Sequence, residues 1–433
     1  MRLLHTADWH LGHTLREWER DREFHDTLDW LVATLQAERV DALVIAGDIF
    51  DQAVPPAAAQ HLWHRFLIDA WRALPQLHIA AIAGNHDHAA RLQASAPVLE
   101  ALGRLHVLGS PDPARWVVEL PASEGPGAMC AALPFLRPSD LPLGVEPLDG
   151  FAQVVKAALD QARERAKPGQ ALVAMSHCYM VGGEVSELSE RRIQRGHQDA
   201  VPAAVFPSDL AYVALGHLHL AQAVGGREGL RYAGSLLPLS MDERGYRHGV
   251  TLVELQGAEL RSVRQLPVPR PVELRRIPER GAAPLPEVLA AIGQLPERTG
   301  AGEAALWPFV EVQVRVDAPD ASLRKVLADA LAAKAVRVVH VATVLAGGGG
   351  ALGDDAPDVP SLGDLGAAEV FARKWRLDYG SLPGDDVRAD FAHLVALAED
   401  PKRADEDREA RPAPLWTARP AGEFSGSSAK AEG

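Results

Sequence analysis

The sequence predicts an α/β fold, because short buried strands alternate with helical segments through residues 1 to 265. Apolar runs of strand length occur in LVIAGD, IAAIAGNHD, ALVAMSH, YVALGHLH and GVTLVEL. Helical spacing of apolar residues fills several of the intervals, including residues 22 to 38 and 57 to 74. The stretch from 116 to 135 and the later strands have turn-like connections, so we expect part of the sheet structure to be antiparallel.

Residues beyond 267 predict smaller units. After an Arg/Pro-rich crossing at 268 to 281, FVEVQVRV (309 to 316) alternates like a half-exposed strand, 322 to 335 is helical and 336 to 345 is a strand again. A Gly-rich linker and two further helical patterns follow. The predicted boundaries are 1–267 for the main α/β domain, 268–346 for a β-α-β domain, 347–363 for a flexible linker, 364–400 for a helix pair and 401–433 for a disordered tail.

The composition is that of a globular protein, with 47% hydrophobic and 24% charged residues in 433. No apolar run approaches the roughly 18 to 20 residues that span a bilayer, and the N-terminal residues lack a signal-peptide pattern. Two cysteines are too few for a disulfide framework, which favours a reducing compartment. We therefore expect a cytoplasmic protein.

The net charge of −14 argues, taken alone, against binding to nucleic acid. Its distribution weakens that argument, because residues 350 to 433 carry 17 acidic and 10 basic residues and so hold half of the net charge. Bound divalent cations would offset several of the remaining carboxylates. Net charge is therefore a weak discriminator for this chain.

Metal-binding residue types recur at the ends of five predicted strands. A single D-x-H means little in a chain with 17 histidines, but five such motifs at the carboxyl ends of strands place their side chains at one edge of the sheet structure. The motifs are DWH with Asp8 and His10, GDIFD with Asp48 and Asp51, GNHD with Asn85 and His86, SH with His177, and GHLH with His217 and His219.

The residue types indicate which metals fit. Asp, His and Asn without a thiolate suit Mn²⁺, Fe²⁺ or Mg²⁺, whereas structural zinc favours cysteine. Even if only seven of these nine residues are ligands, they are too many for one ion, and a pair of ions that shares a carboxylate accounts for the number. Such a pair typically catalyses in-line displacement at phosphorus.

This series of motifs resembles the calcineurin-like metallophosphoesterases, and it is most similar to the SbcD-type nuclease subunits of bacterial DNA double-strand-break repair. The narrower resemblance is carried by LHTADWHLG, GDIFDQAVPP, GNHD, YVALGHLHLAQAVGG and RYAGSLLPLSMDE. It covers roughly residues 1 to 400. It implies a four-layer α/β/β/α sandwich with a small α+β capping domain and a C-terminal helix pair.

The resemblance also implies residue roles. One ion would be held by Asp8, His10 and His219, the other by Asn85, His177 and His217, with Asp48 bridging the two. His86 would lie beside the scissile phosphate, and Asp51 would orient its imidazole. Asp87 we expect to be structural, as a cap of its loop or of the following helix.

As an activity, the resemblance implies a 3′-to-5′ exonuclease on double-stranded DNA ends and an endonuclease on single strands and hairpins, using Mn²⁺ best. A general or cyclic-nucleotide phosphodiesterase of the same superfamily is the alternative. A DNA-end scaffold with structural metals is a third hypothesis, against which the intact His86 argues.

The partners implied are DNA and an SbcC-type ATPase, with a homodimer inside a heterotetramer that associates with the nucleoid. ATP would bind the partner, since the chain has no GxxxxGK[ST] motif. Two basic clusters are either DNA contacts or solvated faces: Arg191, Arg192 and Arg195, and Arg270, Arg275, Arg276 and Arg280. An apolar stripe would either dock on the ATPase or pack onto this chain: Val387, Phe391, Leu394 and Val395.

Overall fold

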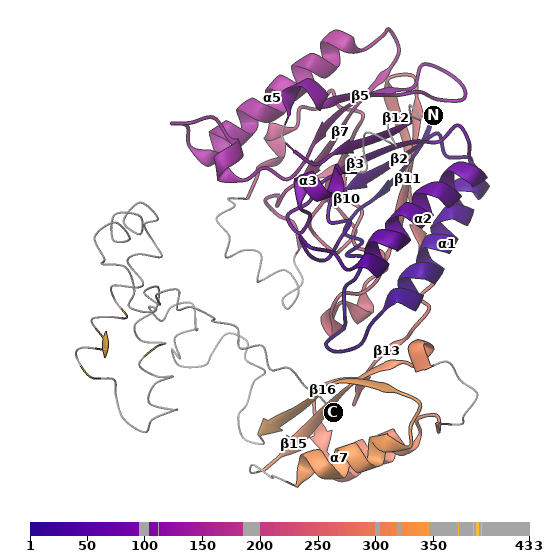
Figure 1. Cartoon of the computed structure of the whole chain (residues 1–433), viewed down its shortest axis with the longest axis vertical. Coiled ribbons are helices and arrows are strands. Elements are labelled where there is room, and N and C mark those ends of the chain that lie inside the picture. The colour runs from indigo at the N-terminus through magenta and orange to yellow at the C-terminus, as the bar shows by residue number, and fades with distance from the viewer. Residues whose placement is uncertain are drawn as a thin grey trace, which may run out of the picture. The chain divides into compact units, whose positions relative to one another are not determined.

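Two six-stranded sheets packed face to face form the main domain, with helices on their outer faces (Figure 1). This is the four-layer α/β/β/α sandwich that the family resemblance implied, and it agrees with the α/β fold that the sequence pattern predicted. The computed structural model describes residues 1–94, 104–110, 112–184, 200–298, 304–317 and 322–345, and beyond them residues 371, 384, 387, 388 and 391.

The first sheet carries the parallel strands whose ends bear most of the predicted site. Its strand order is β12-β11-β1-β2-β3-β4, and β11 and β12 add to the edge of β1 in antiparallel fashion. The strands are β1 (Arg2–Thr6), β2 (Ala42–Ala46), β3 (His78–Ile82), β4 (Leu105–Leu108), β11 (Gly249–Gln256) and β12 (Glu259–Pro267). Its outer face packs against α1 (Asp21–Ala37) and α2 (Ala57–Ala73).

The second sheet has the strand order β5-β6-β7-β8-β10-β9. The pairs β5–β6 and β9–β10 are antiparallel, which confirms the prediction of a partly antiparallel structure. Its strands are β5 (Val117–Leu120), β6 (Ala128–Leu133), β7 (Ala171–His177), β8 (Tyr212–Gly216), β9 (Gln222–Val224) and β10 (Arg227–Tyr232). Helix α5 (Pro147–Arg165) covers its outer face.

The core between the sheets is built largely from small side chains, among them Ala46, Ala80, Cys130 and Ala132. Small side chains let the two sheets approach closely, so that loops from both sheets can meet at one edge. No helix in the described part of the chain has the length and apolar character needed to cross a bilayer.

The small domain contains the predicted β-α-β unit, formed by β15 (Phe309–Val316), α7 (Leu323–Ala332) and β16 (Arg337–Leu345). Two expectations for this region are wrong. The crossing at 268 to 281 contains a strand, β13 (Leu274–Ile277), which pairs with β15. As a consequence β15 lies between two strands, and its first four residues are buried rather than half-exposed.

Strand β14 (Ala283–Pro284) and α6 (Leu285–Gly293) complete this domain. The predicted domain boundaries stay predictions. The linker at 347–363, Leu394, Val395 and the tail at 401–433 lie outside the described residues.

Two residues of the predicted docking stripe are described, and both are half-buried in helical conformation: Val387 and Phe391. The ring of Phe391 stacks on that of Phe371, with centroids 4.0 Å apart and planes 6° from parallel. Phe371 belongs to the first helix of the predicted pair. This contact favours packing within the chain for that one aromatic side chain.

Candidate metal centre

The predicted ligands gather where the loops after β1 and β2 run side by side. The backbone N–H of Asp8 donates to the carbonyl of Gly47, and that of His10 donates to the carbonyl of Asp48, each at an N···O distance of 3.0 Å. Three groups of side chains, within which the candidate ligand atoms lie less than 4.8 Å apart, overlap here. They are Asp8, His10 and His219; Asp8, Asp48 and His177; and His10, Asp48 and His86.

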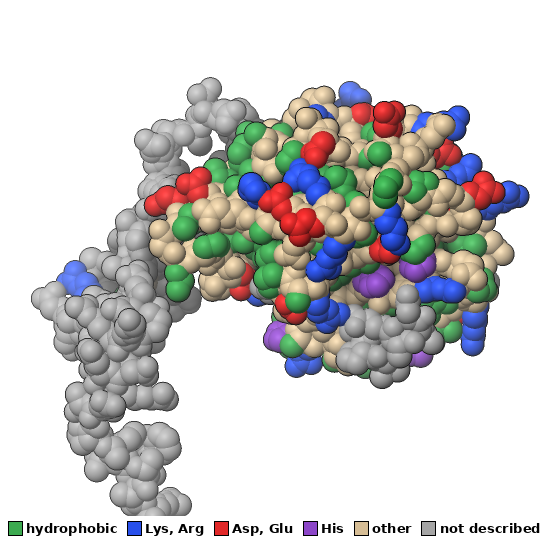
Figure 2. Space-filling model, turned by 90° about the horizontal axis from the view of Figure 1, so that it is seen from above, with side chains coloured by type: hydrophobic (Ala, Val, Ile, Leu, Met, Phe, Trp, Pro, Cys, Tyr) green, Lys and Arg blue, Asp and Glu red, His purple; other side chains and the backbone are tan. Residues whose placement is uncertain are grey.

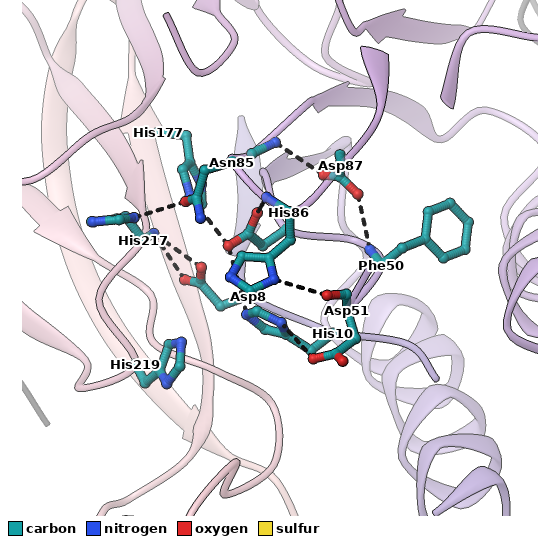
Figure 3. Close-up of polar contacts among 12 residues, drawn as sticks. Asp8, His10, Phe50, Asp51, Asn85, His86, Asp87, His177, His217 and His219 are labelled. Atoms are coloured by element: carbon teal, nitrogen blue, oxygen red, sulfur yellow. Dashed lines mark hydrogen bonds and ion pairs between the residues drawn. The ribbon is translucent and has the colours of Figure 1, made fainter. Parts of the chain in front are cut away.

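Figure 3 shows the remaining predicted ligands facing the same space. The Asn85 Oδ1 lies 2.9 Å from His177 Nε2 and 3.0 Å from His217 Nδ1. The backbone N–H of His217 donates to both carboxylate oxygens of Asp8, at 3.0 and 3.1 Å. All seven side chains therefore converge, although they come from five separate strand ends.

The backbone is strained where four of these residues sit. Asp8, His10, Asp48 and His217 have φ angles of 53°, 48°, 50° and 109°, in the region that side chains other than glycine rarely adopt. Each such conformation costs on the order of 1 to 3 kcal/mol, and strain of this kind clusters at functional sites. The rest of the fold therefore supplies the stability that keeps these side chains aimed at one point.

Two motif glycines are required by close approach. A Cβ at Gly84 would lie 2.1 Å from Asp48 Oδ1, and a Cβ at Gly216 would lie 1.9 Å from the carbonyl oxygen of Ala46. Both distances are far below a van der Waals contact. Glycine before Asn85 and before His217 is thus the condition for bringing the loops together.

Three of the histidines are oriented through Nδ1. His10 Nδ1 lies 3.2 Å from the carboxylate of Asp51, and His177 Nδ1 donates to the Ala46 carbonyl over 2.8 Å. His219 Nδ1 lies 2.9 Å from the carboxylate of Glu243. A partner on Nδ1 fixes the ring and turns Nε2 toward the centre, as metal-ligating histidines require.

The charges of the centre are strongly perturbed by burial. Burial raises the pKa of Asp8 to about 7. Burial also acts to raise the pKa of Asp48, but the attraction of His177 outweighs it and the pKa falls below its ordinary value. His177 responds in kind: burial alone would lower its pKa, but the Asp48 carboxylate raises it to about 9. Burial lowers the pKa of His10, and that of His217 to about 3.

The residues fit a pair of divalent ions. Asp8 and Asp48 are both fully buried carboxylates, a costly arrangement that bound cations relieve. Within the described residues, the buried Nε2 of His10 has no hydrogen-bond partner. Asp48 Oδ2 lies 3.6 Å from His10 Nε2 and 3.4 Å from His177 Nε2, so this carboxylate stands between the two groups of nitrogen donors.

His86 is held beside the centre by its neighbours rather than as one more buried ligand. Its backbone N–H donates to Asp48 Oδ1 over 2.8 Å, and its Nδ1 donates to the backbone carbonyl of Asp51 over 2.8 Å. This contact agrees with the expectation that Asp51 orients the His86 imidazole, but it is made by the backbone of Asp51 and not by its side chain. The carboxylate of Asp51 turns to His10, and only its backbone carbonyl contacts His86 (Figure 3).

Asp87 ties the loops after β2 and β3 together. Its carboxylate accepts from the backbone N–H groups of Ile49, Phe50 and Gly84, at 2.9 to 3.1 Å. It therefore caps the loop, as one of the two expected structural roles. The loop that carries Asp48 is fixed to the loop that carries Asn85 and His86 in this way.

Comparisons with known proteins agree with this centre. The family model of the calcineurin-like phosphoesterases matches residues 1–221, which is half of the chain. The chain belongs to this family. It is therefore a phosphoesterase that uses two divalent ions.

Relatives of this phosphoesterase match much of its length. The SbcD subunit of nuclease SbcCD from Rhodobacter capsulatus is 44% identical over 359 residues, which cover 78% of this chain and 86% of that protein. The proteins of the same name from Escherichia coli K12 and Bacillus subtilis are 38% and 37% identical, over 62% and 60% of this chain and 68% and 67% of theirs. A second family model, the type 5 capsule protein repressor C-terminal domain, matches residues 270–379.

Sequence reasoning missed one functional candidate of the phosphoesterase, Glu243. It lies on a short 3₁₀ helix, η4 (Met241–Gly245), and its carboxylate is fully buried against His219. A signal was present, because the stretch RYAGSLLPLSMDE that carried the family resemblance ends on this residue. A carboxylate 24 positions after its histidine has no spacing rule that would single it out.

Of the two basic clusters, the structure describes only the second. Arg191, Arg192 and Arg195 lie outside the described residues. In the second cluster Arg276 pairs with Glu311, while Arg270 donates to two backbone carbonyls of the loop after η4 and of η4 itself. On the face shown in Figure 2, acidic and basic side chains are interspersed.

Proposed function

We propose that this phosphoesterase is a Mn²⁺-dependent DNA nuclease subunit that works with an SbcC-type ATPase in DNA end processing, repair and recombination. The observation that carries the proposal is the 44% identity to a nuclease subunit over 86% of its length. The activities are 3′-to-5′ exonuclease on double-stranded ends and endonuclease on single strands and hairpins.

The ions are held by two sets of three ligands and one shared carboxylate. Asp8, His10 and His219 hold one ion, Asn85, His177 and His217 hold the other, and Asp48 contacts both. The grouping of Asp8, His10 and His219 supports the first set, and the contacts of Asn85 Oδ1 to His177 and His217 support the second. The position of Asp48 between His10 and His177 supports its sharing.

Manganese is the proposed metal, with Mg²⁺ or Fe²⁺ as alternatives, because the donors are oxygen and imidazole nitrogen without thiolate. When bound, two such ions lower the pKa of a water molecule and neutralise charge on the phosphate. The buried carboxylates and imidazoles of the chain hold this chemistry away from bulk solvent.

His86 acts on the departing oxygen. Its Nδ1 proton is engaged by the Asp51 carbonyl, which leaves Nε2 as the atom available to substrate. In its protonated form the imidazole stabilises negative charge on the phosphate, and it can give the Nε2 proton to the leaving oxygen. Its partial exposure at the edge of the buried centre suits a group that meets substrate.

The partners are proposed from the family resemblance. The chain pairs with a second copy through its phosphoesterase domain inside a heterotetramer, and the stripe of Val387, Phe391, Leu394 and Val395 docks on the ATPase. Arg191, Arg192 and Arg195 contact DNA, and the complex works on the nucleoid. Because the ring of Phe391 already stacks on Phe371, we propose that Phe391 holds the helix pair together and that the other residues of the stripe make the contact to the ATPase.

One comparison of substrates tests the proposal. Purified full-length protein with Mn²⁺ is assayed on a DNA hairpin and on bis-p-nitrophenyl phosphate, with and without the ATPase partner. We expect hairpin cleavage that the partner stimulates. Hydrolysis of the small ester alone, under all conditions, would favour a general or cyclic-nucleotide phosphodiesterase instead.

A shortened chain tests the modular part of the proposal. Ending the chain at residue 363 removes the proposed docking helices and leaves all seven proposed ligands. We expect Mn²⁺-dependent hydrolysis of the small ester to remain and stimulation by the partner to disappear. Stimulation that persists in the shortened chain would place the docking surface elsewhere.

A further inference from the structure

The carboxylate of Glu243 is buried completely and both of its oxygens are engaged. One oxygen lies 2.9 Å from His219 Nδ1, and the other accepts from the backbone N–H of Leu239 over 2.9 Å. A buried carboxylate is costly unless its partners are in place, so this side chain has little freedom to adopt another position. Its position therefore fixes the orientation of the His219 imidazole.

This contact determines which nitrogen of His219 faces the centre. With the proton of Nδ1 directed at Glu243, the lone pair of the neutral ring is on Nε2. His219 is grouped with Asp8 and His10 as one possible ion site. His10 has a carboxylate partner of its own, Asp51, so both imidazoles of this group are backed by carboxylates.

The neighbours of Glu243 on η4 attach to the small domain. Met241 packs in a hydrophobic cluster with residues of that domain, including Leu274 of β13 and Phe309 of β15. The Asp242 carboxylate lies 3.3 Å from Arg276 Nη2 of β13. Consecutive residues of one short helix therefore contact the small domain and the metal centre.

We propose that Glu243 is a positioning residue for the ligand His219, and that η4 couples retention of the ion at Asp8, His10 and His219 to the seating of the small domain. The inference rests on the metal assignment in the proposed function. It adds that the two ions differ in what holds them. Only the one at His219 depends on contacts to the small domain through η4.

Manganese titration of the full-length chain tests the coupling, with free Mn²⁺ followed by electron paramagnetic resonance. The wild type is expected to bind two ions. In Glu243→Gln one of the two ions should bind about 10- to 100-fold more weakly, while the affinity for the other ion is unchanged. This is the loss typically seen when the hydrogen-bond partner of a metal-ligating histidine is removed. Glu228→Gln, on a side chain that is 66% exposed, is the matched control and should bind both ions as the wild type does.

Asp242→Ala tests the link to the small domain without touching the contact to His219. The affinity for the same ion should fall, by a smaller factor than in Glu243→Gln. Wild-type affinity in Asp242→Ala overturns the coupling, and it decides the coupling alone should Glu243→Gln fail to fold. If Glu243→Gln lowers the affinity for both ions equally, or leaves both affinities unchanged, the positioning role is overturned.

A second readout does not depend on bound metal. Nitrogen-15 spectra of histidine-labelled, metal-free protein report which ring nitrogen carries the proton. We expect His219 to be protonated at Nδ1 in the wild type and to lose that preference in Glu243→Gln. A proton on Nε2 in the wild type would overturn the inference. A wild type that binds fewer than two ions would instead refute the metal assignment.

Discussion

Adding one methyl group at Gly84 tests how tightly the centre is built. In Gly84→Ala the new Cβ would lie 2.1 Å from Asp48 Oδ1 and 2.4 Å from the Asp48 backbone nitrogen. Rotating the Asp48 side chain relieves only the first contact, because the second is to backbone. The φ angle of Gly84 is not positive, so the effect of the substitution comes from crowding and not from a forbidden backbone conformation.

The size of the effect follows from the displacement required. Real Cβ atoms essentially never approach another heavy atom closer than 3.0 Å, and ordinary contacts begin at 3.4 Å. The 2.4 Å contact to the Asp48 backbone nitrogen therefore requires Asp48 and the Gly84 loop to separate by about 0.6 Å at least, and by about 1 Å for an ordinary contact. A misplacement of about 1 Å can cost roughly 10²-fold in rate, or about 2.7 kcal/mol of transition-state stabilisation. We expect kcat/KM for the Mn²⁺-dependent hydrolysis of a phosphodiester to fall by about that factor or more.

The assay is hydrolysis of bis-p-nitrophenyl phosphate, with Mn²⁺ binding measured by calorimetry on the same preparations. Gly293→Ala is the control, because a Cβ at Gly293 in α6 would meet no heavy atom within 4 Å. A Gly84→Ala protein that binds two ions with wild-type affinity and keeps kcat/KM within twofold of wild type would refute the reasoning.

Three further predictions concern other parts of the molecule. His86→Ala should lower cleavage by about two orders of magnitude or more with Mn²⁺ binding intact, and normal turnover would contradict the assigned role. Glu23→Gln leaves the buried guanidinium groups of Arg20 and Arg337 without their carboxylate, so it should lower the free energy of unfolding by about 3 to 5 kcal/mol in urea titrations. The control is Glu254→Gln at a half-exposed ion pair, which should lower it by less than about 1 kcal/mol. Burial lowers the pKa of His5 to about 3, so its contribution to stability is complete above the unfolded pKa of about 6.5 and is lost as the pH falls from there toward 3. His5→Gln should reduce the loss of stability between pH 7 and pH 5, and an unchanged loss would show that other groups cause it.

The strands and their ends could be predicted because the apolar run that marks a strand and the polar residues that follow it are both local features of the sequence. Completely buried runs such as Leu43 to Ala46 leave no choice but a central strand, and the polar residues that follow must then lie at its carboxyl end. The strand-end pattern therefore located the candidate residues, and the family resemblance selected the seven proposed ligands among them. Their convergence is what the structure adds.

Details within the site were not predictable, because they depend on the path of the backbone. Whether Asp51 uses its carboxylate or its carbonyl toward His86 is decided by the turn after β2, which no spacing rule describes. Strand β13 was missed because its sequence, LRRI, looks like exposed loop. Arg276 is accommodated there by the carboxylates of Glu311 on the neighbouring strand and of Asp242 on η4.

The central claim is that seven side chains hold two divalent cations that share Asp48. Crystals grown with Mn²⁺ and measured at the manganese absorption edge test it most directly. We expect two anomalous peaks roughly 3.5 to 4 Å apart, each within coordinating distance of the Asp48 carboxylate. A single peak under saturating Mn²⁺, or two peaks with Asp48 turned away from both, would contradict it.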